Sequence, residues 1–378
     1  MTAAEDVVTC PHGADCGACG LLGVRHAIAL EEKRAMVIAA LDRARVPRVR
    51  VEPCLPSPCI EGYRNRAKMA VRLGSGRQGA RLGYYKARSR DVVDAPDCRV
   101  LLPEVLATTR SLRELVASRQ RAFEKLRFVD VRAAIDPSRQ HLTLVLDATD
   151  VPRLPLEEIA AACPAVAGIS ANCNPGAGPQ VLKGPVKCVR GDRDLLVEIG
   201  GIRMHVSPGS FFQVNPFMLA PIHERLRAFF RGAEVLVDLY AGAGTHAFAL
   251  QAAGVKRTLM IEGVPAAVQD ARRTIDEHAL ATVKVYGSPV ERATRRIVAE
   301  RADALLLNPS RQGATRDVLG AIGASEARKV AYLSCDPETL ARDLGVLVGS
   351  RFWIERVEPI DMMPQTRSVE ALALLSRR

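Results

Sequence analysis

The sequence predicts an α/β fold built on a doubly wound parallel sheet, preceded by a smaller α+β unit. From about residue 215 onward, apolar strands alternate with helical segments, the pattern of a parallel sheet covered by helices on both faces. Residues 61–205 instead contain short strands bounded by turn signals. The first 60 residues hold several cysteines and a helical pattern from His26 to Arg45. We therefore expect three parts: an arm over 1–60, a central β-rich domain over 61–205 and an α/β domain over 206–378.

The charge of the chain points to a polyanionic partner. The 378 residues include 53 Lys and Arg against 42 Asp and Glu, a formal net charge of +11. Thirteen of these cations, and only the two acids Glu52 and Glu61, fall between Arg43 and Arg90. Such a stretch could be the solvated surface of an Arg-rich protein. We favour contact with nucleic acid, because clustered cations bind phosphates well. A membrane surface is less well supported, since no amphipathic basic helix or lipidation signal accompanies the charge.

The N-terminus and the apolar runs indicate a cytoplasmic protein without a membrane partner. Residues 1–8 are polar and acidic, unlike the basic and apolar parts of a signal peptide. No uninterrupted apolar run approaches the length of a transmembrane helix. In the cytoplasm, the ten cysteines are expected to be reduced, metal-bound or catalytic rather than paired in disulfides.

A glycine-rich loop between two strands predicts a nucleotide-type binding site. An apolar run through Asp238 leads into Gly242 and Gly244, and a helical segment follows. The next strand ends at Glu262, 24 residues after Asp238. This is a Rossmann-like βαβ unit, with glycines where the backbone approaches a ligand and an acid placed to bind ribose hydroxyls. A Gly-x-Gly alone is often only a tight turn, so its position between strand and helix carries the prediction.

Asp238 distinguishes two classes of ligand for this loop. A dinucleotide would place its pyrophosphate at the helix N-terminus, where the nearby carboxylate would repel it. S-adenosylmethionine has no phosphate, and its sulfonium and amine both tolerate carboxylates. The sequence therefore favours this methyl donor over a nicotinamide cofactor.

Two residues near the C-terminus, a cysteine and a glutamate, indicate which reaction the site could catalyse. Cys335 follows an apolar strand and precedes Asp336-Pro337, an expected N-cap and first helical position. Cys335 therefore lies at the edge of the sheet where open α/β folds bind ligands. It also precedes a helix N-terminus, which we expect to lower the pKa of its thiol. A buried cysteine with only a structural role is the simpler alternative. Glu370 follows 35 residues later. Methylation of a pyrimidine carbon needs a thiolate that adds to the ring and a base that later removes a proton, and these two residues supply them.

Five motifs together resemble the RNA uracil-5 methyltransferases, in order and in spacing, across the C-terminal half. The N-terminal half is similar to the ribosomal branch of that family through the runs 63–69 (YRNRAKM) and 82–85 (LGYY). The five motifs are Phe211-Phe212-Gln213-x-Asn215, Asp238-Leu239-Tyr240-x-Gly242-x-Gly244-Thr245, Asn308-Pro309-x-Arg311-x-Gly313, Ser334-Cys335-x-Pro337-x-Thr339-x-x-Arg342-Asp343 and Pro364-Gln365-Thr366-x-x-Val369-Glu370.

The resemblance implies a Rossmann-like S-adenosylmethionine-dependent methyltransferase domain and assigns roles to residues of this chain. Cys335 would add to carbon 6 of a flipped-out uracil, carbon 5 would take the methyl group, and Glu370 would remove the proton from carbon 5. The positions at which the family binds the methyl donor are Gln213, Tyr240, Glu262 and Asn308.

The chain departs from the family pattern at two places. Many relatives carry Asp-Pro-Pro where this chain has Asn308-Pro309-Ser310, and the missing second Pro is expected to loosen the turn. Ser368 stands where a His often precedes Val-Glu. Asn at position 308 resembles one ribosomal branch, which also lacks an N-terminal TRAM-type domain, and we expect no such domain before Cys10.

Three N-terminal cysteines have the spacing of metal ligands. Cys10, Cys16 and Cys19 form C-x5-C-x2-C, and Cys98 follows in a separate segment. Such spacing lets three thiolates reach one face of a small cluster while a fourth arrives from another strand. Structural zinc remains open, as do unmetallated surface thiols. The resemblance implies a 4Fe–4S cluster, which the ribosomal branch carries and the bacterial transfer-RNA branch lacks, and hence 23S ribosomal RNA as partner.

We therefore expect a monomeric enzyme that methylates carbon 5 of one uridine in a single-stranded loop of 23S ribosomal RNA, where an unstacked base is accessible. Two alternatives remain: a transfer-RNA uridine methyltransferase that carries a cluster, and an RNA-binding cluster protein that has lost turnover. The choice of uridine depends on RNA shape and is not encoded in any motif of this chain.

Overall fold

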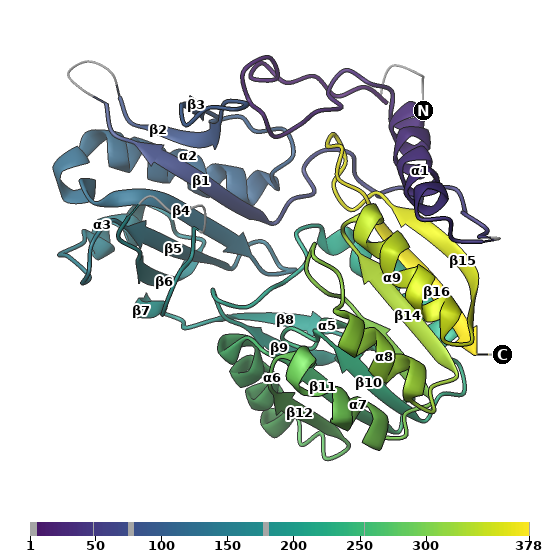
Figure 1. The fold of residues 1–378 in the computed structure, drawn as a ribbon. Helices are drawn as coiled ribbons and strands as arrows, with labels where there is room; N and C mark the ends of the chain where they lie inside the picture. Colours follow the sequence, from purple (N-terminus) through teal and green to yellow (C-terminus); the bar gives the residue numbers. More distant parts are fainter. Residues whose placement is uncertain (1–5, 48, 75–78, 177–180, 253, 378) are drawn as a thin grey trace.

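Two seven-stranded sheets and one separate hairpin form the framework of the computed structural model (Figure 1). The structure describes residues 6–377 except 48, 75–78, 177–180 and 253; the first five residues of the acidic N-terminal stretch lie outside this range. The first sheet has the strand order β3-β2-β1-β4-β5-β6-β7, and the second has the order β12-β11-β10-β13-β14-β16-β15.

The first sheet has one apolar and one polar face. On β4, Val129 and Val131 point into a core closed by α2 and α3, while Asp130 and Arg132 alternate with them on the opposite face. The elements of this part are β1 (Arg66–Arg72), β2 (Arg81–Tyr85), β3 (Val92–Asp94), α2 (Pro103–Ser118), η1 (Gln120–Phe123), β4 (Leu126–Ala133), β5 (Gln140–Leu146), α3 (Leu156–Ala162), β6 (Val166–Cys173) and β7 (Lys187–Gly191).

The second sheet is wound on both sides, as the alternation of strands and helices predicted. Strands β10 to β14 are parallel, and β16 runs antiparallel between β14 and β15. One face packs on α4 and α5, and the other on α7, α8 and α9. The elements are η2 (Pro216–Met218), α4 (Leu219–Phe229), β10 (Val235–Leu239), α5 (Thr245–Gln251), β11 (Arg257–Glu262), α6 (Pro265–Glu277), β12 (Val283–Gly287), η3 (Val290–Arg292), α7 (Thr294–Ala299), β13 (Ala304–Leu307), α8 (Arg316–Ala324), β14 (Lys329–Ser334), α9 (Pro337–Gly349), β15 (Phe352–Ile360) and β16 (Glu370–Arg377).

A hairpin of β8 (Leu195–Ile199) and β9 (Ile202–Val206) follows the first sheet in the chain but packs with the second part. Its apolar residues share a core with α5 and α6. The hairpin lies within the stretch 61–205 expected for the central domain, yet its apolar face is buried by the α/β part.

The N-terminal helix α1 (His26–Arg43) packs against α9 and β15, near the other end of the chain (Figure 1). Val37, Ala40 and Leu41 enter the core of the second sheet. Beyond the helix, Val51 and Leu55 form parallel bridges with β15. Each helix within the described ranges is too short or too polar to cross a bilayer.

Candidate active site

The second sheet brings Cys335 and Glu370 to one edge. Cys335 directly follows the parallel strand β14 and so lies at its carboxyl end. Because β16 is antiparallel to β14, its first residue, Glu370, lies at the same edge, and the ladder pairs the neighbouring residues Ser334 and Ala371. The two side chains are close enough for the Glu370 carboxylate to raise the pKa of the Cys335 thiol.

Burial dominates the electrostatics of both side chains. It raises the pKa of the Cys335 thiol, Glu370 raises it further, and Arg311 acts in the opposite direction. The expectation that the helix N-terminus would lower the pKa of Cys335 is therefore wrong, because desolvation and a nearby carboxylate outweigh the helix. Burial also raises the pKa of Glu370 to about 7. A carboxyl group with such a pKa can serve as a base near neutral pH.

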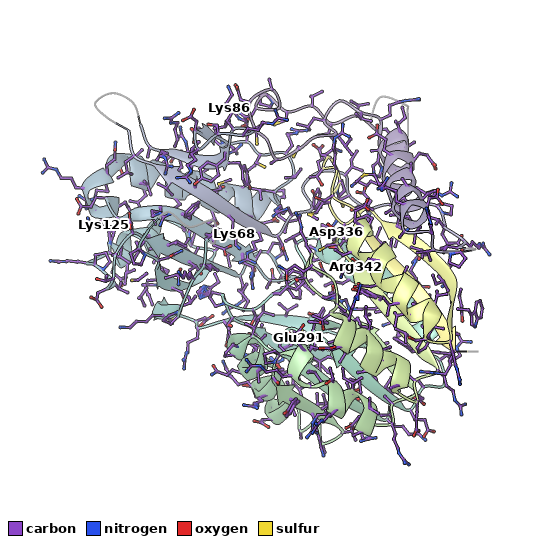
Figure 2. All side chains as sticks on the ribbon, viewed as in Figure 1. Lys68, Lys86, Lys125, Glu291, Asp336 and Arg342 are labelled. Atoms are coloured by element: carbon purple, nitrogen blue, oxygen red, sulfur yellow. The ribbon has the colours of Figure 1, made fainter. Side chains whose placement is uncertain are left out.

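The helix that follows Cys335 has a well-formed N-cap. The Asp336 side chain accepts hydrogen bonds from the backbone N–H groups of Glu338 (3.0 Å) and Thr339 (3.1 Å), and Pro337 occupies the first helical position. Figure 2 shows Asp336 and Arg342 along the first turns of α9. The cap therefore fixes where β14 ends and where Cys335 leaves the strand.

The turn after β13 is held by α9. Thr339 donates its hydroxyl to the Arg311 carbonyl (3.1 Å), and Arg342 donates to the Gln312 carbonyl (2.8 Å). These bonds brace the turn that begins at Ser310, where the sequence led us to expect looseness from the missing second Pro. Contacts from another element thus compensate for local flexibility.

The glycine-rich loop has the backbone conformation that its glycines permit. Gly242 and Gly244 have φ values of +59° and +102°, a region that residues with a side chain rarely occupy. A Cβ on Gly244 would lie 2.5 Å from the Phe248 ring, so only glycine fits there. Glu262 closes the loop by accepting hydrogen bonds from the backbone N–H groups of Gly242 (2.8 Å) and Val264 (2.6 Å).

At the end of β10, Asp238 has an unusual ionisation and Tyr240 an unusual backbone conformation. Asp238 is fully buried, and burial together with Glu262 raises its pKa well above the ordinary value. Neither of its carboxylate oxygens has a hydrogen-bond partner among the described residues, although the Ala247 amide is near enough to favour the charged form. Tyr240 has a φ of +59°, and its hydroxyl donates to Glu291 (2.9 Å). An orphaned carboxylate and a strained tyrosine at one strand end indicate a ligand site.

Asn308 contacts His246, which in turn contacts His223, and sequence reasoning singled out neither of these buried histidines. The Asn308 side-chain amide lies 3.5 Å from Nε2 of His246, whose Nδ1 lies 3.1 Å from Nε2 of His223. Burial lowers the pKa of His246 to about 4 and that of His223 to about 3, so both rings are neutral near pH 7. The position of His246 two residues after Gly244 could have indicated this contact, whereas His223 comes from α4 and carries no such signal.

Gln213 lies in a segment that passes the glycine-rich loop at Phe211. Its side chain is buried, and the carbonyl of Phe211, two residues earlier, would lie 3.9 Å from a Cβ placed on Gly242. The structure thus brings five of the six predicted site residues of the α/β part to the carboxyl edge of the second sheet: Tyr240, Glu262, Asn308, Cys335 and Glu370. The sixth, Gln213, is buried in the segment between β9 and η2.

The four cysteines predicted as ligands meet in space. Cys10, Cys16, Cys19 and Cys98 line one cavity of about 270 Å³. Burial, followed by the charges of Cys98 and Cys16, raises the pKa of Cys19 to about 12. Among the described residues, no three His, Cys, Asp or Glu side chains are arranged to hold a single metal ion. Tyr63 and Thr366 also line the cavity, which therefore borders the segment that leads to Glu370.

The fold is the Rossmann-like fold of S-adenosylmethionine-dependent methyltransferases. A solved structure, the Pyrococcus abyssi tRNA (uracil-54, C5)-methyltransferase in complex with S-adenosyl-L-homocysteine, superimposes with a TM-score of 0.75. The match covers 95% of this chain and 86% of the other, at 21% sequence identity.

The chain belongs to the RNA methyltransferases. It is 30% identical over 386 residues to an uncharacterized RNA methyltransferase of Geobacter sulfurreducens, an alignment that covers 98% of this chain and 77% of the relative. An uncharacterized RNA methyltransferase of Listeria innocua is 28% identical, with 98% and 84% coverage. No protein-family model matches the chain.

Proposed function

We propose that the protein methylates carbon 5 of a uridine in RNA, with S-adenosylmethionine as methyl donor and Cys335 as covalent nucleophile. The observation that carries this proposal is the proximity of Cys335 to Glu370 at the carboxyl edge of the second sheet. A sulfur nucleophile and a carboxyl base beside a glycine-rich loop are the groups that methylation of an unactivated pyrimidine carbon requires.

The two side chains act in the first and the last of three proposed steps. The Cys335 thiolate forms a bond to carbon 6 of the uracil, and the ring electrons make carbon 5 nucleophilic. Carbon 5 bonds to the methyl group as the bond from that group to the donor's sulfur breaks, which leaves S-adenosylhomocysteine. Glu370 then takes the proton from carbon 5, the C–H electron pair re-forms the C5=C6 double bond, and the thiolate departs from carbon 6.

The residues around the glycine-rich loop fit the methyl donor, which supplies an electrophilic methyl group when bound. Gln213, Tyr240, Glu262 and Asn308 would hold it. The unpartnered Asp238 carboxylate is a further acceptor for a cationic ligand, and a nearby positive charge would favour its ionised form.

The four clustered cysteines fit a 4Fe–4S cluster. Such a cluster takes four thiolates, one on each iron, so its ligands surround a body larger than a single ion. The observation that supports the proposal is that Cys10, Cys16, Cys19 and Cys98 line one cavity of about 270 Å³. When bound, the cluster would join the N-terminal arm to the segment that carries Cys98.

We infer 23S ribosomal RNA as the substrate, because the cysteine cluster matches the ribosomal branch of the uracil-5 methyltransferases. Transfer RNA is a second candidate, since the solved structure with a TM-score of 0.75 is named as a tRNA (uracil-54, C5)-methyltransferase. In either RNA the target base must leave its stack to reach the edge of the sheet.

Mass spectrometry of RNA from a deletion strain tests the proposal. We expect one 5-methyluridine to be missing from 23S ribosomal RNA and to return when the intact gene is restored. Loss of a 5-methyluridine from transfer RNA instead would select the second candidate. Unchanged 5-methyluridine in both RNAs would overturn the proposed reaction.

A further inference from the structure

Four consecutive backbone carbonyls in the loop before Glu370 each accept a hydrogen bond from a different distant segment. The loop joins β15 to β16 and spans residues 361–369, which have no regular secondary structure. The donors are Asn215 Nδ2 to the Met362 carbonyl (3.1 Å), Lys33 Nζ to Met363 (3.0 Å), the Tyr63 hydroxyl to Pro364 (2.8 Å) and the Leu21 backbone N–H to Gln365 (3.0 Å).

The side chains that make these bonds are buried. Tyr63 and Asn215 are each 0% exposed, and Lys33 is 1% exposed. Lys33 also forms an ion pair with Asp361, the first residue of the loop, and His26 binds the other oxygen of the same carboxylate (2.7 Å). Buried polar groups of this kind hold one geometry, because no water can replace a lost partner.

The position of Glu370 depends on this loop. Glu370 pairs with Ile360 of β15, but the ladder with β14 begins only one residue later, at Ala371. Toward β14, the paired residues therefore end at Ala371, one residue before the base is reached. The first residue of a strand frays unless a neighbouring segment holds it, and here the neighbouring segment is the loop with its four anchored carbonyls.

The anchors come from the same region as the cysteine cavity. Tyr63 and Thr366 line that cavity, and Leu21 follows Cys19 by two residues. A Cβ placed on Gly20 would lie 3.4 Å from the Arg367 side chain, so the arm and the loop are in direct contact.

We propose that Tyr63 and Lys33 are positioning residues for Glu370, which act by fixing the Pro364 and Met363 carbonyls of the loop. This inference rests on the proposed function, since it concerns the step in which Glu370 removes the proton from carbon 5. A misplaced base leaves the earlier steps intact: Cys335 still adds to carbon 6, and the methyl group is still transferred. The enzyme then stalls as a methylated covalent adduct with RNA.

Accumulation of that adduct is the test. The full-length protein with its metal content intact is incubated with S-adenosylmethionine and a 23S ribosomal RNA fragment, and the covalent complex is separated on a denaturing gel. Glu370→Gln, which removes the base, sets the maximum signal. For Tyr63→Phe, which deletes one hydroxyl, we expect turnover slower by about three- to tenfold, the effect of one hydrogen bond, together with adduct above the wild-type level.

Tyr332→Phe is the matched control. Tyr332 is 0% exposed, and its hydroxyl donates to Asp343 (2.6 Å), outside the loop and the cysteine cavity. We expect no accumulated adduct for this variant. Iron content and melting temperature are measured for every variant, so that loss of a cluster or of the fold is distinguished from a misplaced base.

Lys33→Met provides a second measurement and should also accumulate adduct; if it does not fold, Tyr63→Phe alone decides. Slow turnover of Tyr63→Phe without extra adduct, while Glu370→Gln accumulates it, would overturn the positioning role and leave the proposed function standing. If Glu370→Gln forms no adduct and the wild-type protein methylates no uridine, the proposed function itself fails.

Discussion

The Glu370 carboxyl group lies close enough to the Cys335 thiol to raise the pKa of that thiol, although 35 residues separate the two in the sequence. An antiparallel strand causes this proximity, because β16 starts at the edge where the parallel strand β14 ends. The pair thus depends on strand direction, and its chemistry can be tested one side chain at a time.

Replacement of the nucleophile should separate catalysis from binding. We expect Cys335→Ala to lower methylation of RNA by at least about a thousandfold, because no other group can add to carbon 6. RNA affinity should stay within about twofold of wild type, since phosphate contacts dominate it. Cys188→Ala, at a half-buried cysteine on β7, the edge strand of the first sheet, is the control and should keep its activity. If Cys335→Ala methylated RNA at the wild-type rate, Cys335 could not be the nucleophile.

The rate at which free methylated RNA is released should rise with pH through about 7. The pKa of Glu370 is raised to about 7, and this base must be ionised to accept the proton from carbon 5. The raised pKa of Cys335 acts in the same direction, because only the thiolate adds to the ring. Single-turnover rates of release of free methylated RNA between pH 5.5 and 8.5 provide the measurement, with RNA binding at each pH as control. A rate that falls over this range contradicts the assigned protonation states.

The free energy of unfolding should depend on pH through the buried carboxyl group of Glu370. Folding raises the pKa of Glu370 from its ordinary value of 4.5 to about 7. This group therefore favours folding fully below about pH 4.5 and loses that contribution as the pH rises through 7. Glu370→Gln stays neutral and should be more stable than wild type above pH 7, by up to about 3 kcal/mol. Urea denaturation at pH 5 and pH 8 measures the difference, and an equal stability change at both values would refute the shifted pKa.

The cysteine cavity should hold iron and sulfide. After anaerobic purification we expect brown protein with about four irons per chain. Cys16→Ser should lose most of this iron, whereas Cys173→Ser, which replaces a half-buried cysteine outside the cavity, should retain it. Metal analysis and labile sulfide determination measure the iron and sulfide content per chain of each protein. Stoichiometric zinc without iron would instead support a structural zinc site.

The buried histidine beside Asn308 should make the protein sensitive to acid. The pKa of His246 is lowered to about 4 in the folded state, so unfolded chains take up a proton first, and stability is lost as the pH falls from about 6.5 toward 4. In His246→Phe this loss should shrink by more than about 1 kcal/mol. Thermal melting at pH 7 and pH 5 compares the two proteins. An identical drop in both would exclude His246 as the titrating group.

Much of the candidate site follows from strand order alone. Tyr240, Asn308 and Cys335 each lie at or after the carboxyl end of a parallel strand, and such ends share one edge of a sheet. The spacing of Cys10, Cys16 and Cys19 likewise indicated a common ligand, and the structure places them in one cavity with Cys98. These features are local or periodic, so they can be recognised in a sequence.

Other features depend on contacts between distant segments. The Tyr63 hydroxyl meets the Pro364 carbonyl across 301 residues, and Lys33 meets Asp361 across 328. Neither pair has a spacing or motif that marks it. The direction of the pKa shift of Cys335 was also missed, because burial and the Glu370 charge arise only on folding.

The sequence by itself determined the doubly wound sheet, the glycine-rich loop and the residues that reach its edge, because hydrophobic periodicity and strand direction dictate them. Only the tertiary structure decided the ionisation of Glu370 and Cys335, the buried contact of Asn308 with His246 and the four anchored carbonyls before the base. The reason is physical: desolvation and long-range hydrogen bonds exist only once remote segments exclude water together.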